Sequence, residues 1–218
     1  MIKNLNINEN LEKYIRENSY DLHPVQKDII EYNNSLGNQK KMQISVTQSY
    51  FFQFLIKTNN IKNILEIGTF TGFSALAMAL SLPKNGKITC LDKNEETSKK
   101  AISFFKKAKV ENLIEVKIGP ALKTLDEIKK QKIFFDMIFI DADKENYQNY
   151  YNSCFDLIKN SGFILIDNVL WHGDVADSNK NDKLTNILRD FNSFIKKDDR
   201  IHKTILPLGD GITICRKF

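Results

Sequence analysis

Two short apolar runs of the chain end in side chains that commonly bind metal ions. The run 137–140 leads into Asp141, and the run 163–166 leads into Asp167 and Asn168. Near-continuous apolar runs of this length are typical of parallel strands that are buried on both faces. Because the carboxyl ends of parallel strands lie at one edge of a sheet, we expect Asp141, Asp167 and Asn168 to converge there.

The types of donor in this trio favour a hard divalent cation. Two carboxylates and one amide carbonyl offer only oxygen, which suits magnesium first and also calcium or manganese. Zinc sites instead favour His and Cys. Three protein ligands leave about three positions of an octahedral ion for substrate and water. A competing interpretation is that Asp141 and Asp143 cap a helix beginning near Lys144, and that Asp167 and Asn168 only form a turn.

A glycine-containing loop follows the first predicted strand, where folds of this kind bind nucleotide-like cofactors. The loop runs from Glu66 to Gly72, and a helix follows from Phe73. Its pattern is not GxGxxG, because Phe70 stands where the second glycine lets a pyrophosphate approach the backbone. The sequence therefore argues against NAD and favours a cofactor that has a ribose but no phosphate.

Asp92 ends the next predicted strand, about 20 residues after Gly72, which is the spacing at which a carboxylate accepts hydrogen bonds from ribose hydroxyls. S-adenosylmethionine fits this arrangement, with its cationic methionine end near Glu66 and the Gly68 backbone. The competing interpretation treats Glu66 as an acid near a helix N-terminus and Asp92 as a cap for the helix that starts at Glu95.

Length and composition predict one soluble globular domain. The 218 residues suffice for one full core, so we predict a single domain over 1–218 in which 1–60 form a helical cover. Hydrophobic residues make up 42% of the chain and charged residues 27%, as in ordinary globular proteins. The chain shows neither a secretory leader pattern nor an apolar run near the ~18 residues that span a bilayer, so we expect a cytoplasmic protein without a membrane partner.

Charge and cysteine content add two further expectations. The net charge is +5, but the basic residues are scattered and form no stripe with interleaved aromatics. We therefore expect no nucleic-acid partner. Cys90, Cys154 and Cys215 are widely spaced in apolar surroundings, so we interpret them as reduced thiols in the core.

The order of predicted elements indicates an α/β fold with a doubly wound, mostly parallel seven-stranded sheet. We expect helices at 11–16, 24–36, 45–57, 73–82 and 182–197, a polar linker at 37–41 and a loop at 168–180. Strands are expected near 63–67, 87–92, 113–118, 136–141, 161–167, 201–206 and 211–216. The last two strands are separated by so few residues that they must form a terminal antiparallel hairpin.

Several segments together resemble the cation-dependent O-methyltransferases of the caffeoyl-coenzyme A O-methyltransferase family, including its bacterial members, and more distantly catechol O-methyltransferase. The segments are MQIS at 42–45, LEIGTFTGFSALAMAL at 65–80, GPALKTLD at 119–126, IFIDADKENYQNYY at 138–151, IDNVLWHG at 166–173 and LPLGDGITI at 206–214. The resemblance covers about residues 40–218 and implies the Rossmann-like fold of class I methyltransferases.

Residue by residue, the resemblance implies a complete active site. It implies metal ligation by Asp141, Asp167 and Asn168, and a catalytic role for Asp141 and for Lys144 as general base. It implies cofactor contacts from Met42, the Ile44 backbone, Glu66, Gly68, Ser74, Asp92, Ala121 and Asp143. From their positions next to the ligand motifs, Trp171 and Tyr147 either flank the acceptor ring or are ordinary packing. His172 either contacts the acceptor or, as the pattern favours, is a structural or solvated side chain of the loop.

The function that these features predict is divalent-metal-dependent methyl transfer from S-adenosylmethionine to a hydroxyl of a catechol-like small molecule. The resemblance also implies a homodimer. His172 stands where the plant enzymes have asparagine, so a phenylpropanoid coenzyme A acceptor does not follow from the resemblance. Two other functions remain open: an RNA or protein methyltransferase on the same scaffold, and a binding protein that keeps the metal and cofactor site without turnover.

Overall fold

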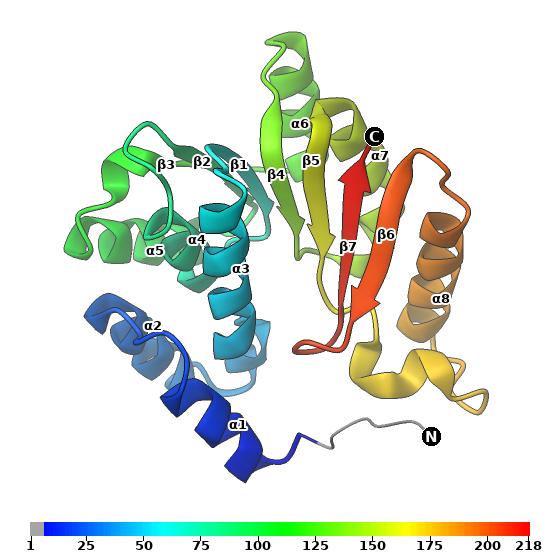
Figure 1. Cartoon of the computed structure of the whole chain (residues 1–218), viewed down its shortest axis with the longest axis horizontal. Coiled ribbons are helices and arrows are strands. Elements are labelled where there is room, and N and C mark those ends of the chain that lie inside the picture. The colour runs from blue at the N-terminus through cyan, green and yellow to red at the C-terminus, as the bar shows by residue number, and fades with distance from the viewer. Residues whose placement is uncertain (1–6) are drawn as a thin grey trace.

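A seven-stranded sheet forms the centre of the computed structural model, which describes residues 7–218 (Figure 1). The first six residues of the predicted domain lie outside the described range. The strands are β1 (Asn63–Ile67), β2 (Lys87–Asp92), β3 (Ile114–Ile118), β4 (Phe135–Ile140), β5 (Ile158–Ile166), β6 (Ile201–Leu206) and β7 (Ile212–Lys217). Their order across the sheet is β3-β2-β1-β4-β5-β7-β6.

Strand directions confirm the predicted doubly wound sheet and its terminal hairpin. The strands β3, β2, β1, β4 and β5, which are neighbours in this order, pair in parallel. In contrast, β7 runs antiparallel to both β5 and β6. Most strand ends fall within one residue of their predicted positions. The exception is β5, which begins at Ile158, earlier than predicted, because its pairing with β4 shifts register between Phe135 and Met137.

The helices are α1 (Glu9–Glu17), α2 (Pro24–Asn34), η1 (Gly37–Met42), α3 (Val46–Thr58), α4 (Phe73–Ala79), α5 (Glu95–Lys107), η2 (Glu111–Leu113), α6 (Ala121–Lys130), η3 (Lys144–Asn146), α7 (Tyr147–Leu157), η4 (Trp171–Ala176) and α8 (Lys183–Lys196). The predicted helices at the N-terminus are confirmed. Two predictions were wrong: 37–41 is a 3-10 helix rather than a linker, and the loop 168–180 contains another. Both segments close short-range backbone hydrogen bonds, such as Gln43 N–H to the Lys40 carbonyl.

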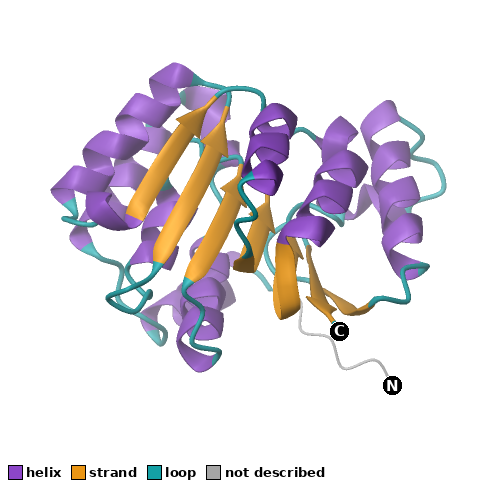
Figure 2. Cartoon of the chain, turned by 90° about the horizontal axis from the view of Figure 1, so that it is seen from above, coloured by secondary structure: helices purple, strands orange, loops and turns teal. Residues whose placement is uncertain are grey.

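Helices cover both faces of the sheet (Figure 2). Alternate side chains of β4 enter opposite cores: Met137 and Phe139 pack with α2 to α5, and Ile138 and Ile140 pack with α6 to α8. The Phe52 ring of α3 packs edge-on against Phe139, with 4.8 Å between ring centroids. The predicted helical cover is therefore part of the core that supports β4.

Burial also bears out the interpretation of the cysteines. Cys90, Cys154 and Cys215 are all buried and free of disulfide bonds.

Among the helices of residues 7–218, none combines the length and the apolar character needed to cross a bilayer.

The carboxyl ends of β1, β4 and β5 meet at one edge of the sheet, on the side where the β6–β7 loop also lies (Figure 1). Backbone pairing continues past two strand ends. Asp141 N–H donates to the Ile67 carbonyl at 2.8 Å, and Asp167 N–H donates to the Ile140 carbonyl at 3.0 Å. Parallel pairing thus fixes the backbone at Asp141 and Asp167 before any side-chain contact is considered.

Gly68 makes this edge possible, and its replacement provides a test. Gly68 has a φ of +92°, and an added Cβ would lie 1.8 Å from the Asp141 carbonyl oxygen. We predict that Gly68→Ala lowers the free energy of unfolding by about 2–5 kcal/mol, because it adds backbone strain to overpacking. Urea denaturation measures this loss.

Gly173 offers a matched control, because its φ is +90° and an added Cβ meets nothing within 4 Å. Gly173→Ala should cost only the backbone strain, about 1–3 kcal/mol. Equal losses in the two variants would contradict the importance of the contact between Gly68 and Asp141.

Candidate functional site

The structure brings two of the three predicted metal ligands, Asp141 and Asn168, to the ammonium group of Lys144. The Nζ atom of Lys144 donates to Asp141 Oδ1 at 3.1 Å and to Asn168 Oδ1 at 2.6 Å. Within residues 7–218, no three His, Cys, Asp or Glu side chains are grouped as a metal site. The cluster at the strand ends has two carboxylates, the amide oxygen of Asn168 and one cationic side chain.

Asp167 is the most buried member of this cluster, with 2% of its surface exposed. Its Oδ1 atom accepts a 2.6 Å hydrogen bond from Gln48 Nε2, and its backbone carbonyl accepts one from the Tyr147 hydroxyl at 3.0 Å. Burial and then the charge of Asp141 raise the pKa of the Asp167 carboxyl. The carboxylate form of Asp167 therefore depends on compensation from neighbouring donors and cations.

The helix-cap interpretation of the two acids near Lys144 is wrong. Asp143 precedes η3 but makes no capping bond with its side chain, and the Asp141 carboxylate faces Lys144 instead. Asp143 accepts a 2.7 Å bond from the Tyr150 hydroxyl and a second bond from Asn146. Although burial opposes them, these bonds lower the pKa of Asp143. Asp143 is thus held as a carboxylate beside the metal-ligand cluster.

The turn interpretation holds for the backbone of Asn168 but not for its side chain. Asn168 has a φ of +56°, so the chain does turn directly after β5. Its side chain accepts the bond from Lys144. The next residues are held by the β6–β7 loop, since Val169 and Leu170 donate to backbone carbonyls of Gly211 and Asp210 at 3.1 Å.

Asp92 anchors the predicted cofactor loop. Its Oδ2 atom accepts the backbone N–H groups of Thr69 at 2.9 Å and Phe70 at 2.8 Å. Its Oδ1 atom accepts Asn94 N–H, and Asn94 itself caps α5. The simple-cap interpretation of Asp92 is therefore wrong: the carboxylate joins the carboxyl end of β2 to the loop between β1 and α4.

Glu66 lies beneath the same loop. Its carboxylate accepts the Ser74 hydroxyl at 2.5 Å and the Cys90 thiol at 3.3 Å, and no part of the residue is exposed. Burial raises the pKa of Glu66 to about 7, against the hydrogen bonds from Ser74 and Cys90. Glu66 and Ser74, both predicted to contact the cofactor, are thus bonded to each other in this structure.

The remaining predicted cofactor contacts lie at the ends of helices. Met42 ends η1 and is 57% exposed, whereas Ile44 is buried just before α3. Ala121 is the first residue of α6. Buried Asn33 ties this N-terminal part to the cofactor loop, because it donates to Gln43 and accepts from Thr71, each at 2.8 Å.

The predicted acceptor residues lie on the segment that follows Asn168. Trp171 and His172 both have positive φ angles, and their rings stack with centroids 5.5 Å apart. His172 is exposed, and its backbone N–H donates to Asp210 Oδ1 at 2.5 Å. Tyr147 is only 1% exposed and packs edge-on against Phe191, so it is core packing and not a flank of the acceptor ring.

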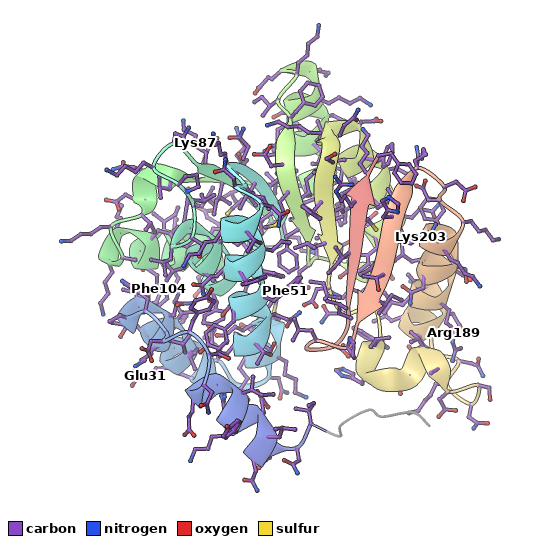
Figure 3. All side chains as sticks on the ribbon, in the orientation of Figure 1. Glu31, Phe51, Lys87, Phe104, Arg189 and Lys203 are labelled. Carbon is purple, nitrogen blue, oxygen red and sulfur yellow. The ribbon has the colours of Figure 1, made fainter. Side chains whose placement is uncertain are left out.

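An open hollow of about 620 Å³ lies beside this segment. It is lined by Leu170, His172, Gly173, Val175, Ala176, Gly209 and Asp210. Arg189 of α8 holds the outer wall: its guanidinium donates to the backbone carbonyls of Val175 at 3.0 Å and Asp174 at 2.9 Å (Figure 3). The wall is thus fixed by a side chain that lies far from it in sequence.

Sequence reasoning missed four residues that hold the site: Asn33, Gln48, Arg189 and Asp210. Gln48 stands three residues after Ser45, a spacing that is already explained by a helix capping box. Asp210 lies in a turn-like Leu-Gly-Asp-Gly sequence, and Asn33 and Arg189 lie within helices. Each residue has an ordinary local explanation, so its role became visible only through contacts between distant segments.

Comparison with known proteins gives the family of this chain. The family model for O-methyltransferases matches residues 16–218. Caffeoyl-CoA O-methyltransferase 1 of Arabidopsis thaliana is 40% identical over 227 residues, which cover 99% of this chain and 87% of the relative. A probable caffeoyl-CoA O-methyltransferase of Dictyostelium discoideum is 38% identical, with 97% and 93% coverage.

Solved structures agree as well. The O-methyltransferase of Bacillus cereus in complex with SAH has a TM-score of 0.88 at 29% identity and covers 96% of this chain and 97% of its own. The SAH-bound methyltransferase of Podospora anserina has a TM-score of 0.89 at 27% identity, with full coverage of both chains. The match of the family model and these similarities over nearly the whole length show that this chain belongs to the O-methyltransferase family.

Proposed function

We propose that this protein transfers a methyl group from S-adenosylmethionine to a hydroxyl of a catechol-like small molecule, with a divalent cation held by Asp141, Asp167 and Asn168. The single observation that carries the proposal is the position of Lys144. Its ammonium group lies within hydrogen-bonding distance of two of the three predicted ligands. Because the oxygens of Asp141 and Asn168 already bind one cationic group, their position also favours binding of a metal cation.

The donor set supports a hard ion in this place. The oxygens of Asp141, Asp167 and Asn168 suit magnesium, and calcium or manganese are also compatible with them. A bound divalent ion supplies a Lewis acid that lowers the pKa of an acceptor hydroxyl and orients two vicinal oxygens. Asp141 lies at the carboxyl end of β4, and Asp167 and Asn168 lie at the carboxyl end of β5, next to the predicted cofactor loop.

The loop between β1 and α4 supports S-adenosylmethionine as methyl donor. Relatives of this fold have been solved with SAH or SAM bound. In this chain, Asp92 holds the loop backbone. It ends β2, at the spacing from Gly72 that predicts contact with a ribose. Phe70 occupies the position at which a dinucleotide site needs glycine, which argues against NAD. Ser74 and Glu66 support the loop from below.

Methyl transfer breaks the sulfonium–methyl bond and forms the bond between oxygen and the methyl carbon, while the acceptor hydroxyl loses its proton. The three reacting atoms must lie in line, so positioning supplies much of the rate. We assign proton removal to Lys144, whose Nζ atom lies within hydrogen-bonding distance of Asp141 and Asn168. To act as the base, Lys144 must first lose its own proton, because only the neutral amine accepts the proton of the acceptor hydroxyl. The hollow beside His172 and Asp210 offers space for the ring of an acceptor.

Metal removal tests the central element of this proposal. We predict that excess chelator stops methyl transfer to a catechol and that added magnesium restores it, because the ion orients and activates the acceptor hydroxyl. Asp141→Ala should likewise lose turnover while the fold persists. Activity is measured with labelled S-adenosylmethionine, and far-ultraviolet circular dichroism checks the fold.

A phenol with a single hydroxyl is the matched control acceptor and should react poorly even with magnesium. Full turnover in excess chelator would overturn metal dependence. If catechols are not methylated under any condition but RNA or protein is, the macromolecular methyltransferase is correct. Cofactor binding with no methylation of any acceptor would favour the non-catalytic binding protein.

Asp92 provides a test of the cofactor site. We predict that Asp92→Ala weakens S-adenosylmethionine binding by roughly 10- to 100-fold, since hydrogen bonds to a charged group contribute about 1.5–3 kcal/mol. Calorimetry measures the affinity. Asp136→Ala is the matched control, because Asp136 also accepts two backbone N–H groups, from Lys62 and Asn63, at the opposite end of β4. The same affinity in both variants would contradict the assignment of the ribose to Asp92.

Lys144 should affect turnover and metal affinity in opposite directions. We predict that Lys144→Met lowers kcat by ~10² to 10⁴, as expected for loss of a general base. The same change should tighten magnesium binding by roughly tenfold or more, because it removes a positive charge close to the ion. Unit charges ~4 Å apart interact by about 1 kcal/mol in water and about 4 kcal/mol at an effective dielectric constant near 20. Kinetics and calorimetry measure the two effects.

Lys159→Met is the control, since Lys159 pairs with Asp136 away from the site. A Lys144→Met enzyme within about threefold of the wild-type rate, with chemistry rate-limiting, would exclude Lys144 as the base and leave acceptor activation to the ion.

A further inference from the structure

Gln48 of α3 contacts Asp167, a predicted metal ligand that lies 119 residues further along the chain. Its Nε2 atom donates to Asp167 Oδ1 at 2.6 Å, and both residues are buried. We propose that Gln48 is a positioning residue that orients the Asp167 carboxylate for metal binding. The inference rests on the proposed metal site, and it assigns a function in that site to the N-terminal helices.

The capping box of α3 determines which way the Gln48 amide faces. Its Oε1 atom accepts the Ser45 backbone N–H at 2.8 Å, while its own backbone N–H donates to the Ser45 hydroxyl at 3.1 Å. A peptide N–H needs an acceptor, so the amide oxygen must face Ser45. The amide NH₂ must then face Asp167. One side chain thus completes the helix start and presents a donor to the carboxylate.

The surroundings leave this amide little freedom. Gln48 is 2% exposed, and a Cβ added to Gly209 in the β6–β7 loop would lie 2.3 Å from Oε1. The Tyr147 hydroxyl holds the backbone carbonyl of Asp167. The hydrogen bond from Gln48 fixes the orientation of the carboxylate through Oδ1 and does not engage Oδ2 of Asp167. Side chains that orient metal ligands in this way typically change metal affinity by about 10- to 100-fold.

The chain contains a matched control on α2. Gln26 is likewise the third residue of a helix in a capping box, accepts the His23 N–H at 3.1 Å, and is 1% exposed. Its Nε2 atom has no hydrogen-bond partner among the described residues. Gln26 and Gln48 therefore share the helix-start role, and only Gln48 reaches a predicted metal ligand.

The experiment compares Gln48→Met with Gln26→Met in the full-length protein. Calorimetry with magnesium and the electron paramagnetic resonance spectrum of bound manganese report on the site without any need for turnover. We expect both variants to lose thermal stability through the lost cap. Only Gln48→Met should bind the ion about 10- to 100-fold more weakly and alter the manganese spectrum.

The outcomes separate the two proposals. Wild-type protein that binds no divalent ion overturns the proposed metal site. Wild-type binding with equal affinity in Gln48→Met overturns the role of Gln48, and so does an equal loss of affinity in Gln26→Met. If Gln48→Met does not fold, Gly209→Ala provides the test. Its added Cβ displaces the Gln48 amide while the glutamine itself is retained in the sequence. Unchanged metal affinity in Gly209→Ala would then count against the inference.

Discussion

The rest of the site depends on the buried carboxylate of Asp167. Removing a charge from water is costly unless hydrogen bonds and opposite charges compensate. The structure provides the Gln48 amide as a hydrogen-bond donor and the charge of the nearby Lys144 ammonium. Each comes from a different part of the chain. Compensation of this one carboxylate therefore links α3, the segment after β4 and the segment after β5 into one constellation.

A single carboxylate, that of Asp92, holds the predicted cofactor loop by accepting hydrogen bonds from several backbone N–H groups. Asp92 binds two N–H groups of the loop and one at the start of α5. Gly68 lets the end of β1 approach the Asp141 carbonyl. The predicted cofactor loop and the predicted metal ligand Asp141 are thus in direct backbone contact at one sheet edge.

The N-terminal helices are more than a cover. Phe52 packs on β4, and Asn33 bonds to the predicted cofactor loop. Phe104 of α5, which is labelled in Figure 3, packs against Tyr32 of α2 with 5.9 Å between ring centroids. Gln48 then carries the contact to Asp167. On the other side of the site, Asp210 holds the backbone at His172, and Arg189 holds the backbone at the wall of the hollow. Residues distant in sequence therefore fix both sides of the site.

The sequence by itself determined the alternation of strands and helices, the terminal hairpin and the convergence of Asp141 with Asn168. Hydrophobic periodicity, loop length and strand-end position are local signals that tertiary contacts did not override. Tertiary structure alone decided that Tyr147 is core, that Asp92 anchors a loop, that 37–42 is helical and that Gln48 faces Asp167. These features depend on contacts between segments up to 119 residues apart, for which each residue type already had a sufficient local explanation. A sequence pattern shows that a side chain such as Gln48 completes a helix cap. It does not show that the same side chain also contacts a residue far away in the sequence.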